Sequence, residues 1–142
     1  MKILIDTNVL VDFFLRREPF LADAVQIFEL CQKDIVEGVI AAHSIVNMAY
    51  ILRKTFTLDE LKKIFLRLCK LFKVEAIDVE KIIRAIEDKD FTDFEDCLQL
   101  QCAIDFNADY IVTRNVADFK SSKIPAITPQ DFLKLYAEKE VF

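Results

Sequence analysis

The segment KILIDTNVLVDF (residues 2–13) changes from a strand pattern to a helix pattern at one acidic residue. KILI is a short apolar run of the kind found in strands that are buried on both faces. Asp6 ends this run, and the residues after it follow a helical period up to about residue 34, with a break at Pro19. A buried strand that leads directly into helices is typical of the α/β class of folds.

The rest of the chain repeats this alternation. TLDE (57–60) and TDFE (92–95) predict capping boxes that start two of the helices, so Glu95 is assigned a capping role. Further strands are predicted at 37–42, 73–77, 109–113 and 124–128, and further helices at 44–54, 58–72, 79–89, 93–106 and from Pro129 onward. The pattern favours a single domain, residues 1–142, with a three-layer α/β/α sandwich fold. Its central sheet has four or five mostly parallel strands, and it carries a helical hairpin insertion.

The composition narrows the class of protein. A chain of 142 residues with 54% hydrophobic residues can bury a core of its own, and a single glycine argues against a turn-rich all-β fold. The net charge of −5 argues against a protein that coats nucleic acid regardless of sequence, although one local patch could still contact it. No apolar run approaches the roughly 20 residues of a membrane span. Because Asp6 interrupts the first apolar run, we expect no signal peptide and a cytoplasmic protein.

Polar residues from four separate segments are expected at one edge of the sheet. Ligands of parallel α/β sheets bind at the carboxyl ends of the strands, and the helix that precedes a strand begins at that same edge. The residues that fall there are Asp6, Asn8, Asn47, Asp93, Asp96, Thr113, Asn115 and Asp118. They are therefore predicted to converge in space, although they are scattered along the chain.

The acids in this group have competing interpretations. Acids stabilise helix starts by about 0.3–1 kcal/mol each, and Asp6 alone would be read as a helix cap. Asp93 and Asp96, however, fall within the apolar sector of their helix, where an unpaired carboxylate is costly. Together with Asp6 they favour a metal site. Oxygen ligands suit Mg²⁺ or Mn²⁺, and such an ion supports hydrolysis of a phosphodiester backbone.

The chain also resembles a known family. ILIDTNVLVD at the start, DFEDCLQLQCA, DYIVTRNVADF and KIPAITPQDFL look like a PIN domain, and most like the VapC-like toxins and their relatives. The resemblance implies a Mg²⁺- or Mn²⁺-dependent endoribonuclease of RNA, commonly a homodimer and often neutralised by a VapB-like antitoxin.

The resemblance also assigns roles to individual residues. Asp6 matches the first acid of the family and Asp96 the third, while Asn8 and Thr113 match the polar residues that support the first acid. The fourth acidic position falls in TRNVADF, where Asn115 occupies the commoner site and Asp118 is the nearby carboxylate. The prediction is that Asp6, Asp96 and Asp118 are catalytic and that these three and Asp93 bind the metal. Arg114, Lys120 and Lys123 lie next to this site in the sequence and are the predicted RNA contacts.

One position departs from the family pattern. The second acid, usually a glutamate in the helix after the second strand, aligns with Asn47. An asparagine offers a neutral carbonyl oxygen, so the alternative is a degenerate PIN domain that binds RNA or a protein partner without cleavage. A phosphatase of the haloacid dehalogenase type ranks last, because DTN (6–8) lacks the second acid of the D-x-D motif used by those enzymes.

Overall fold

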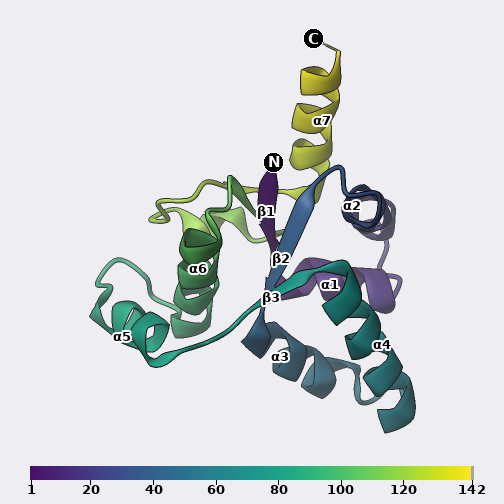
Figure 1. Ribbon diagram of the computed structural model, residues 1–142, viewed down its shortest axis with the longest axis horizontal. Helices are drawn as coiled ribbons and strands as arrows, with labels where there is room; N and C mark the ends of the chain where they lie inside the picture. Colours follow the sequence, from purple (N-terminus) through teal and green to yellow (C-terminus); the bar gives the residue numbers. More distant parts are fainter. Residues whose placement is uncertain (142) are drawn as a thin grey trace.

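Five parallel strands form one sheet in the order β3-β2-β1-β4-β5 (Figure 1). The computed structural model describes residues 1–141. The strands are β1 (Lys2–Ile5), β2 (Glu37–Ala41), β3 (Lys73–Glu75), β4 (Tyr110–Val112) and β5 (Ala126–Ile127). The helices are α1 (Thr7–Phe14), α2 (Leu21–Gln32), α3 (Ala42–Leu52), α4 (Leu58–Leu71), α5 (Val79–Glu87), α6 (Phe94–Phe106), α7 (Pro129–Glu140) and the short 3-10 helix η1 (Val116–Phe119).

Alternate side chains of β1 enter two separate cores. Ile3 and Ile5 pack on the face covered by α1, α2, α3, α4 and α7. Leu4 points to the other face and packs against α6, whose outer side is covered by α5. In Figure 1, α5 and α6 lie on one side of the sheet and α1, α2 and α4 on the other. The predicted α/β/α sandwich is therefore confirmed, with a sheet of five strands that are all parallel.

The predicted elements are all present, and the differences are confined to their ends. The helix predicted at 44–54 begins two residues earlier, as α3. The strands predicted at 73–77, 109–113 and 124–128 are shorter than expected. The two helices between β2 and β3, α3 and α4, make up the helical hairpin insertion. Among residues 1–141, no helix combines the length and apolar character that crossing a bilayer requires.

The order of the strands creates a switch point beside β1. The chain passes from β1 through α1 and α2 to β2 on one side, and from β3 through α5 and α6 to β4 on the other. Asp6 follows β1 directly, and Thr113 follows β4 directly, where Ile5 pairs with Val112. Connections that leave neighbouring strands in opposite directions open a crevice at their carboxyl ends, which is where ligands of such sheets bind.

Candidate metal centre

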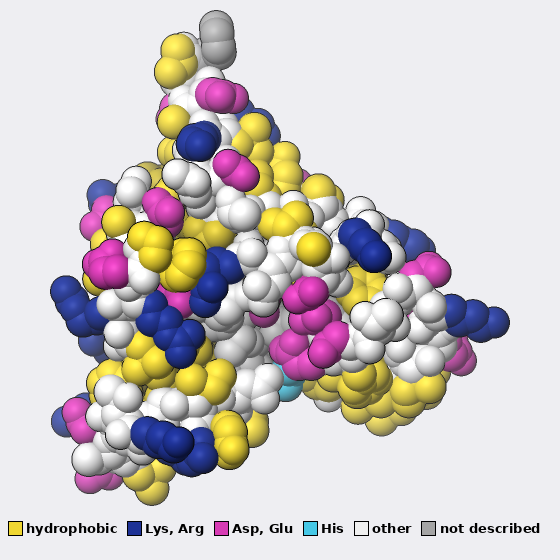
Figure 2. Space-filling model, turned by 180° about the vertical axis from the view of Figure 1, so that it is seen from behind, with side chains coloured by type: hydrophobic (Ala, Val, Ile, Leu, Met, Phe, Trp, Pro, Cys, Tyr) yellow, Lys and Arg dark blue, Asp and Glu magenta, His cyan; other side chains and the backbone are white. Residues whose placement is uncertain are grey.

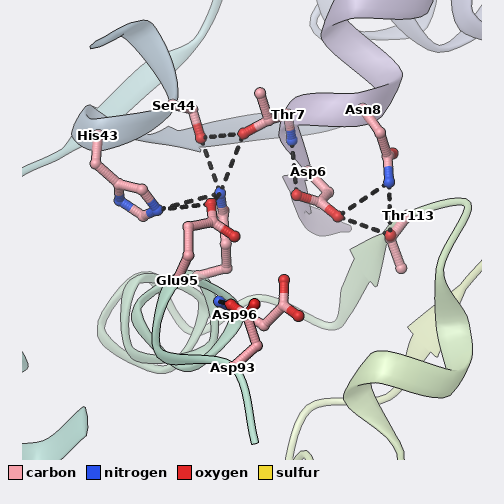
Figure 3. Close-up of polar contacts among 10 residues, drawn as sticks. Asp6, Thr7, Asn8, His43, Ser44, Asp93, Glu95, Asp96 and Thr113 are labelled. Carbon is pink, nitrogen blue, oxygen red and sulfur yellow. Dashed lines mark hydrogen bonds and ion pairs between the residues drawn. The ribbon is translucent and has the colours of Figure 1, made fainter. Parts of the chain in front are cut away.

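Asp6 is held in place from three directions at the end of β1. Its Oδ1 accepts the backbone N–H of Thr7 at 2.7 Å, so it caps α1 as well as facing the crevice. Its Oδ2 accepts the hydroxyl of Thr113 at 2.7 Å and the amide of Asn8 at 3.3 Å (Figure 3). The side chain is nearly buried, and burial raises the pKa of Asp6 to about 6, although the hydrogen bond from Thr113 opposes this. Ionising Asp6 is therefore costly unless a positive charge comes close.

The loop after β4 is tied to the start of α1. Asn8 Nδ2 lies 3.3 Å from Thr113 Oγ1, and Asn8 Oδ1 accepts the backbone N–H of Arg114 at 3.3 Å. The backbone N–H of Asn115 donates to Thr113 Oγ1 at 3.0 Å. The residues expected to support the first acid, Asn8 and Thr113, both contact Asp6. Asn115 does not bond Asp6 itself but donates its backbone N–H to Thr113.

The start of α6 differs from the prediction. The expected capping box of Thr92 and Glu95 is wrong, because the cap is Asp93, whose Oδ1 accepts the backbone N–H of Asp96 at 2.9 Å. The capping box of Thr57 and Glu60 is confirmed. Because the cap is Asp93 rather than Thr92, Glu95 is not needed for a capping hydrogen bond. Glu95 turns instead into the site, which makes it a candidate functional residue that sequence reasoning missed.

Asp93, Glu95 and Asp96 form a group of carboxylates at the amino end of α6. One oxygen from each lies within 4.8 Å of the others. Burial, and after it the neighbouring Asp93 and Glu95 carboxylates, together raise the pKa of Asp96 to about 8. Asp96 therefore shares with Asp6 the property of being hard to ionise in the absence of a cation.

A buried polar network surrounds Glu95 and connects three helices. Glu95 Oε1 lies 2.9 Å from His43 Nε2 in α3 and accepts the amide of Gln99 at 2.9 Å. The Gln99 amide also lies 2.9 Å from Ser44 Oγ and 3.3 Å from Thr7 Oγ1. His43 has no partner close to it in the sequence, so its contact with Glu95, 52 residues away, could not be predicted. The only signal in the sequence is the spacing of Gln99, which stands one helical turn after Glu95 and so can reach it with a hydrogen bond.

Asp6, Glu95 and Asp96 line one open pocket with a volume of about 540 Å³. It is lined by Asp6, Thr7, Asn8, Val11, Arg17, Asn47, Tyr50, Ile51, Glu95, Asp96 and Asn115. Asn47 lies in it as expected, although in the second turn of α3 because that helix starts earlier than predicted. Figure 2 shows acidic side chains gathered near the middle of one face, beside the single histidine, with hydrophobic side chains on both sides of them. Three carboxyl groups, from Asp6, Glu95 and Asp96, are therefore gathered in this crevice.

The remaining predicted residues lie away from this pocket. Asp118 is exposed in η1 and does not line it, whereas Asn115 does. Lys120 and Lys123 are exposed beyond η1. Arg114 pairs with the buried carboxylate of Asp12, at 2.6 and 3.1 Å, and packs over the ring of Phe20. These contacts hold the β4 loop against α1 and α2, and a role of Arg114 in binding RNA stays a prediction.

The side chains of the pocket fit a hard divalent cation. Asp6, Glu95 and Asp96 present only oxygen atoms, which Mg²⁺ and Mn²⁺ prefer, and no sulfur lines the pocket. Burial is the main reason that the pKa of Asp6 and of Asp96 is raised, and nearby carboxylates add to this cost of ionisation in both cases. A bound cation would remove that cost, because it favours the ionised form of each ligand.

The fold and the site together define a class: α/β proteins with an acidic, oxygen-only centre at the switch point of a parallel sheet. The family model described as PIN domain matches residues 2–117. The chain therefore belongs to the PIN-domain family, whose members are generally metal-dependent nucleases. A search of curated protein sequences finds no match.

Solved structures show the same fold at low sequence identity. One is VapBC2 from Rickettsia felis bound to a DNA fragment from their promoter, with 15% identity, a TM-score of 0.64, and coverage of 90% of this chain and 98% of that one. FitAcB from Neisseria gonorrhoeae has 15% identity, a TM-score of 0.65 and the same coverage of 90% and 98%. FitAB bound to an IR36 DNA fragment has 16% identity and a TM-score of 0.62, and the match covers 89% of this chain and 94% of that one.

Proposed function

We propose that this protein is a Mg²⁺- or Mn²⁺-dependent endoribonuclease. The observation that carries the proposal is the pocket at the switch point, where Asp6 from β1 and Asp96 from α6 face one space although 90 residues of chain separate them. Both carboxyls have a raised pKa, as expected for side chains that a bound cation would ionise. The membership of the PIN-domain family supports the same activity.

Asp6 and Asp96 would hold the ion, and Asn8 and Thr113 would orient Asp6. A divalent ion bound there supplies two things: a bound water of lowered pKa, and positive charge to offset the charge that develops on a phosphodiester. Thr113 and Asn8 both donate to Oδ2 of Asp6, and these two hydrogen bonds fix the orientation of the whole carboxylate, including Oδ1. Asp93 lies at the edge, with one oxygen committed to capping α6.

A role as the toxin of a toxin–antitoxin pair is a further part of this proposal. It is supported by the fold shared with VapBC2 and FitAB, whose structures were solved with bound DNA. RNA as substrate, a VapB-like antitoxin and a second copy of the chain are the partners that this role implies, and the cytoplasm is the compartment in which it would act. Exposed hydrophobic residues on α3, among them Val46 and Tyr50, offer a surface for a protein partner near the pocket.

The first experiment compares RNA cleavage in Mn²⁺ by the wild type and by Asp6→Asn and Asp96→Asn. We expect each substitution to lower the cleavage rate by roughly a hundredfold or more. Loss of a residue that only supports a metal ligand lowers activity about 10- to 100-fold, and loss of the ligand itself should lower it at least as much. Induced expression in cells is a second readout, in which the wild type arrests growth and Asp96→Asn does not.

Two further variants complete this comparison. Asp118→Asn should keep most of the activity, because Asp118 lies outside the pocket. Glu87→Gln, an exposed change at the end of α5, controls for the loss of one negative charge. Wild-type cleavage no greater than that of Asp6→Asn and Asp96→Asn, with any divalent ion, would refute the nuclease. It would favour the alternative for which Asn47 argues, a PIN domain that binds RNA or a protein without cutting it.

A further inference from the structure

Glu95 is held toward the pocket by two N–H donors that come from different helices. The donors are His43 Nε2 and the Gln99 amide, each 2.9 Å from Glu95 Oε1. Because a carboxylate can only accept hydrogen bonds, His43 must carry its hydrogen on Nε2, and Gln99 must present its nitrogen rather than its oxygen. Both donors bond the same oxygen, Oε1, so neither of them occupies Oε2.

The donors are themselves anchored in the core. Gln99 and Ser44 are fully buried, and Thr7 donates its hydroxyl to Ser44 Oγ at 2.8 Å. The network therefore joins α1, α3 and α6 around Glu95, next to the Asp6 end of β1. Gln99 Oε1 accepts no hydrogen bond from any of residues 1–141, so the amide is oriented for Glu95 and its own carbonyl is left unpaired among them.

Stability alone does not account for this arrangement. The start of α6 is capped by Asp93 and makes no use of Glu95. Glu95 instead lines the pocket beside Asp96, and one oxygen of each carboxyl lies within 4.8 Å of the other. Carboxylates placed together destabilise the folded chain, and the three that share this pocket, from Asp6, Glu95 and Asp96, are expected only where a cation offsets them.

We propose that Glu95 is a metal-binding carboxylate that replaces the acid missing at Asn47, and that His43 and Gln99 are positioning residues that aim it into the pocket. The proposal deepens the assigned function and rests on it for the presence of an ion in this pocket. It explains how the site keeps three carboxylates, from Asp6, Glu95 and Asp96, although Asn47 is neutral.

The test is Mn²⁺ binding by titration calorimetry, measured on the full chain without RNA. We expect Glu95→Gln to weaken Mn²⁺ affinity at least about tenfold. Tenfold is the lower end of the loss of metal affinity seen when a residue that only supports a ligand is replaced. Glu87→Gln, which removes an exposed glutamate from α5, should leave the affinity unchanged. Circular dichroism establishes that each variant is folded, and Glu95→Ala takes the place of Glu95→Gln if that variant is not. Unchanged affinity in the folded Glu95 variant overturns the proposal.

Two substitutions of His43 test its positioning role. His43→Gln keeps an N–H donor at a similar distance from the backbone and should retain most of the Mn²⁺ affinity. His43→Ala removes the donor and should weaken binding about tenfold, as the loss of a supporting residue does. Equal losses in both variants would show that His43 acts only through packing. Wild-type protein that binds Mn²⁺ through Glu95 but cleaves no RNA would refute the nuclease and leave this metal site standing.

Discussion

At the scale of single residues, Asn47 determines how much charge the pocket carries. It lines the same pocket as Asp6, Glu95 and Asp96, but its amide is neutral. Glu95 approaches that pocket from the opposite helix and is held there by His43. The number of carboxylates around an ion is one of the features that set its affinity for a hard cation. The site therefore has room for a stronger metal centre than the one the sequence encodes.

Asn47→Glu should tighten Mn²⁺ binding by about tenfold or more, because it adds a carboxylate to an all-oxygen donor set. Without metal, the same substitution should lower the midpoint of thermal unfolding, since a further negative charge joins the pocket. Calorimetry and melting in chelator measure the two effects. Asn47→Gln, which keeps the amide but matches the length of glutamate, is the control. If Asn47→Glu and Asn47→Gln bind Mn²⁺ equally, position 47 does not reach the ion.

The residues that sequence could reveal are those whose position along a strand or a helix fixes them. Asp6 ends an apolar strand, and Asp96 begins the helix that leads into the neighbouring strand, so topology alone brings them to one edge. Glu95 was assigned to a helix cap because the capping motif fits two starting points one residue apart. The contact between His43 and Glu95 joins two helices that are far apart in the sequence. Contacts of this kind depend on packing, which no local pattern records.

At the scale of elements, β2 depends on a close approach that only glycine allows. A Cβ added to Gly38 would lie 2.8 Å from a ring carbon of Phe72 and 2.9 Å from the sulfur of Cys31. Phe72 follows α4 and meets Phe28 of α2 edge to face, with ring centroids 5.2 Å apart. The single glycine of the chain thus lets α2 and the end of α4 sit against the sheet.

Gly38→Ala should lower the free energy of unfolding by about 1–3 kcal/mol, the usual cost of adding a methyl group to a well-packed core. Urea unfolding measures it. The double variant Gly38→Ala with Phe72→Leu tests the cause, because the smaller side chain makes room for the methyl. Gly38→Ala should then cost less in the Phe72→Leu background than in the wild type. Equal costs in the two backgrounds would place the strain somewhere other than the Phe72 ring.

The elements themselves were predictable because each has a strong local signal, and their ends were not. The apolar runs of β1 and β2 and the capping box at Thr57 predict their elements almost to the residue. The sequence of α6 does not separate a buried side from an exposed side, because α5 covers the side that a surface helix would expose to water. α6 buries Gln99 and Gln101 as well as apolar residues, so an apolar sector drawn on α6 does not identify which side chains face the site.

At the scale of the whole molecule, the acidic pocket works against folding until a cation binds. Asp6 and Asp96 both have a pKa above the ordinary value of 3.8, near 6 and near 8. The unfolded chain releases these protons at lower pH than the folded chain does. The contribution of these two carboxyls to stability without metal is therefore fully present below about pH 4, and it is lost as the pH rises through 6 for Asp6 and through 8 for Asp96. For the buried Asp6 alone this corresponds to about 3 kcal/mol by neutral pH.

Urea unfolding in chelator should therefore show a stability that falls between about pH 5.5 and pH 8, a window above the titration of ordinary carboxyls. Asp96→Asn removes the group that titrates near 8, so it should be more stable than the wild type at the upper end of this window and show a shallower fall. Glu87→Gln should follow the wild type. Saturating Mn²⁺ should reverse the trend in the wild type, because the ion binds the ionised carboxyls and stabilises the folded state by mass action. The ion should do little for Asp96→Asn. A wild-type stability in chelator that stays level across the window would show that Asp6 and Asp96 ionise freely, and the pocket would then need no cation to relieve it.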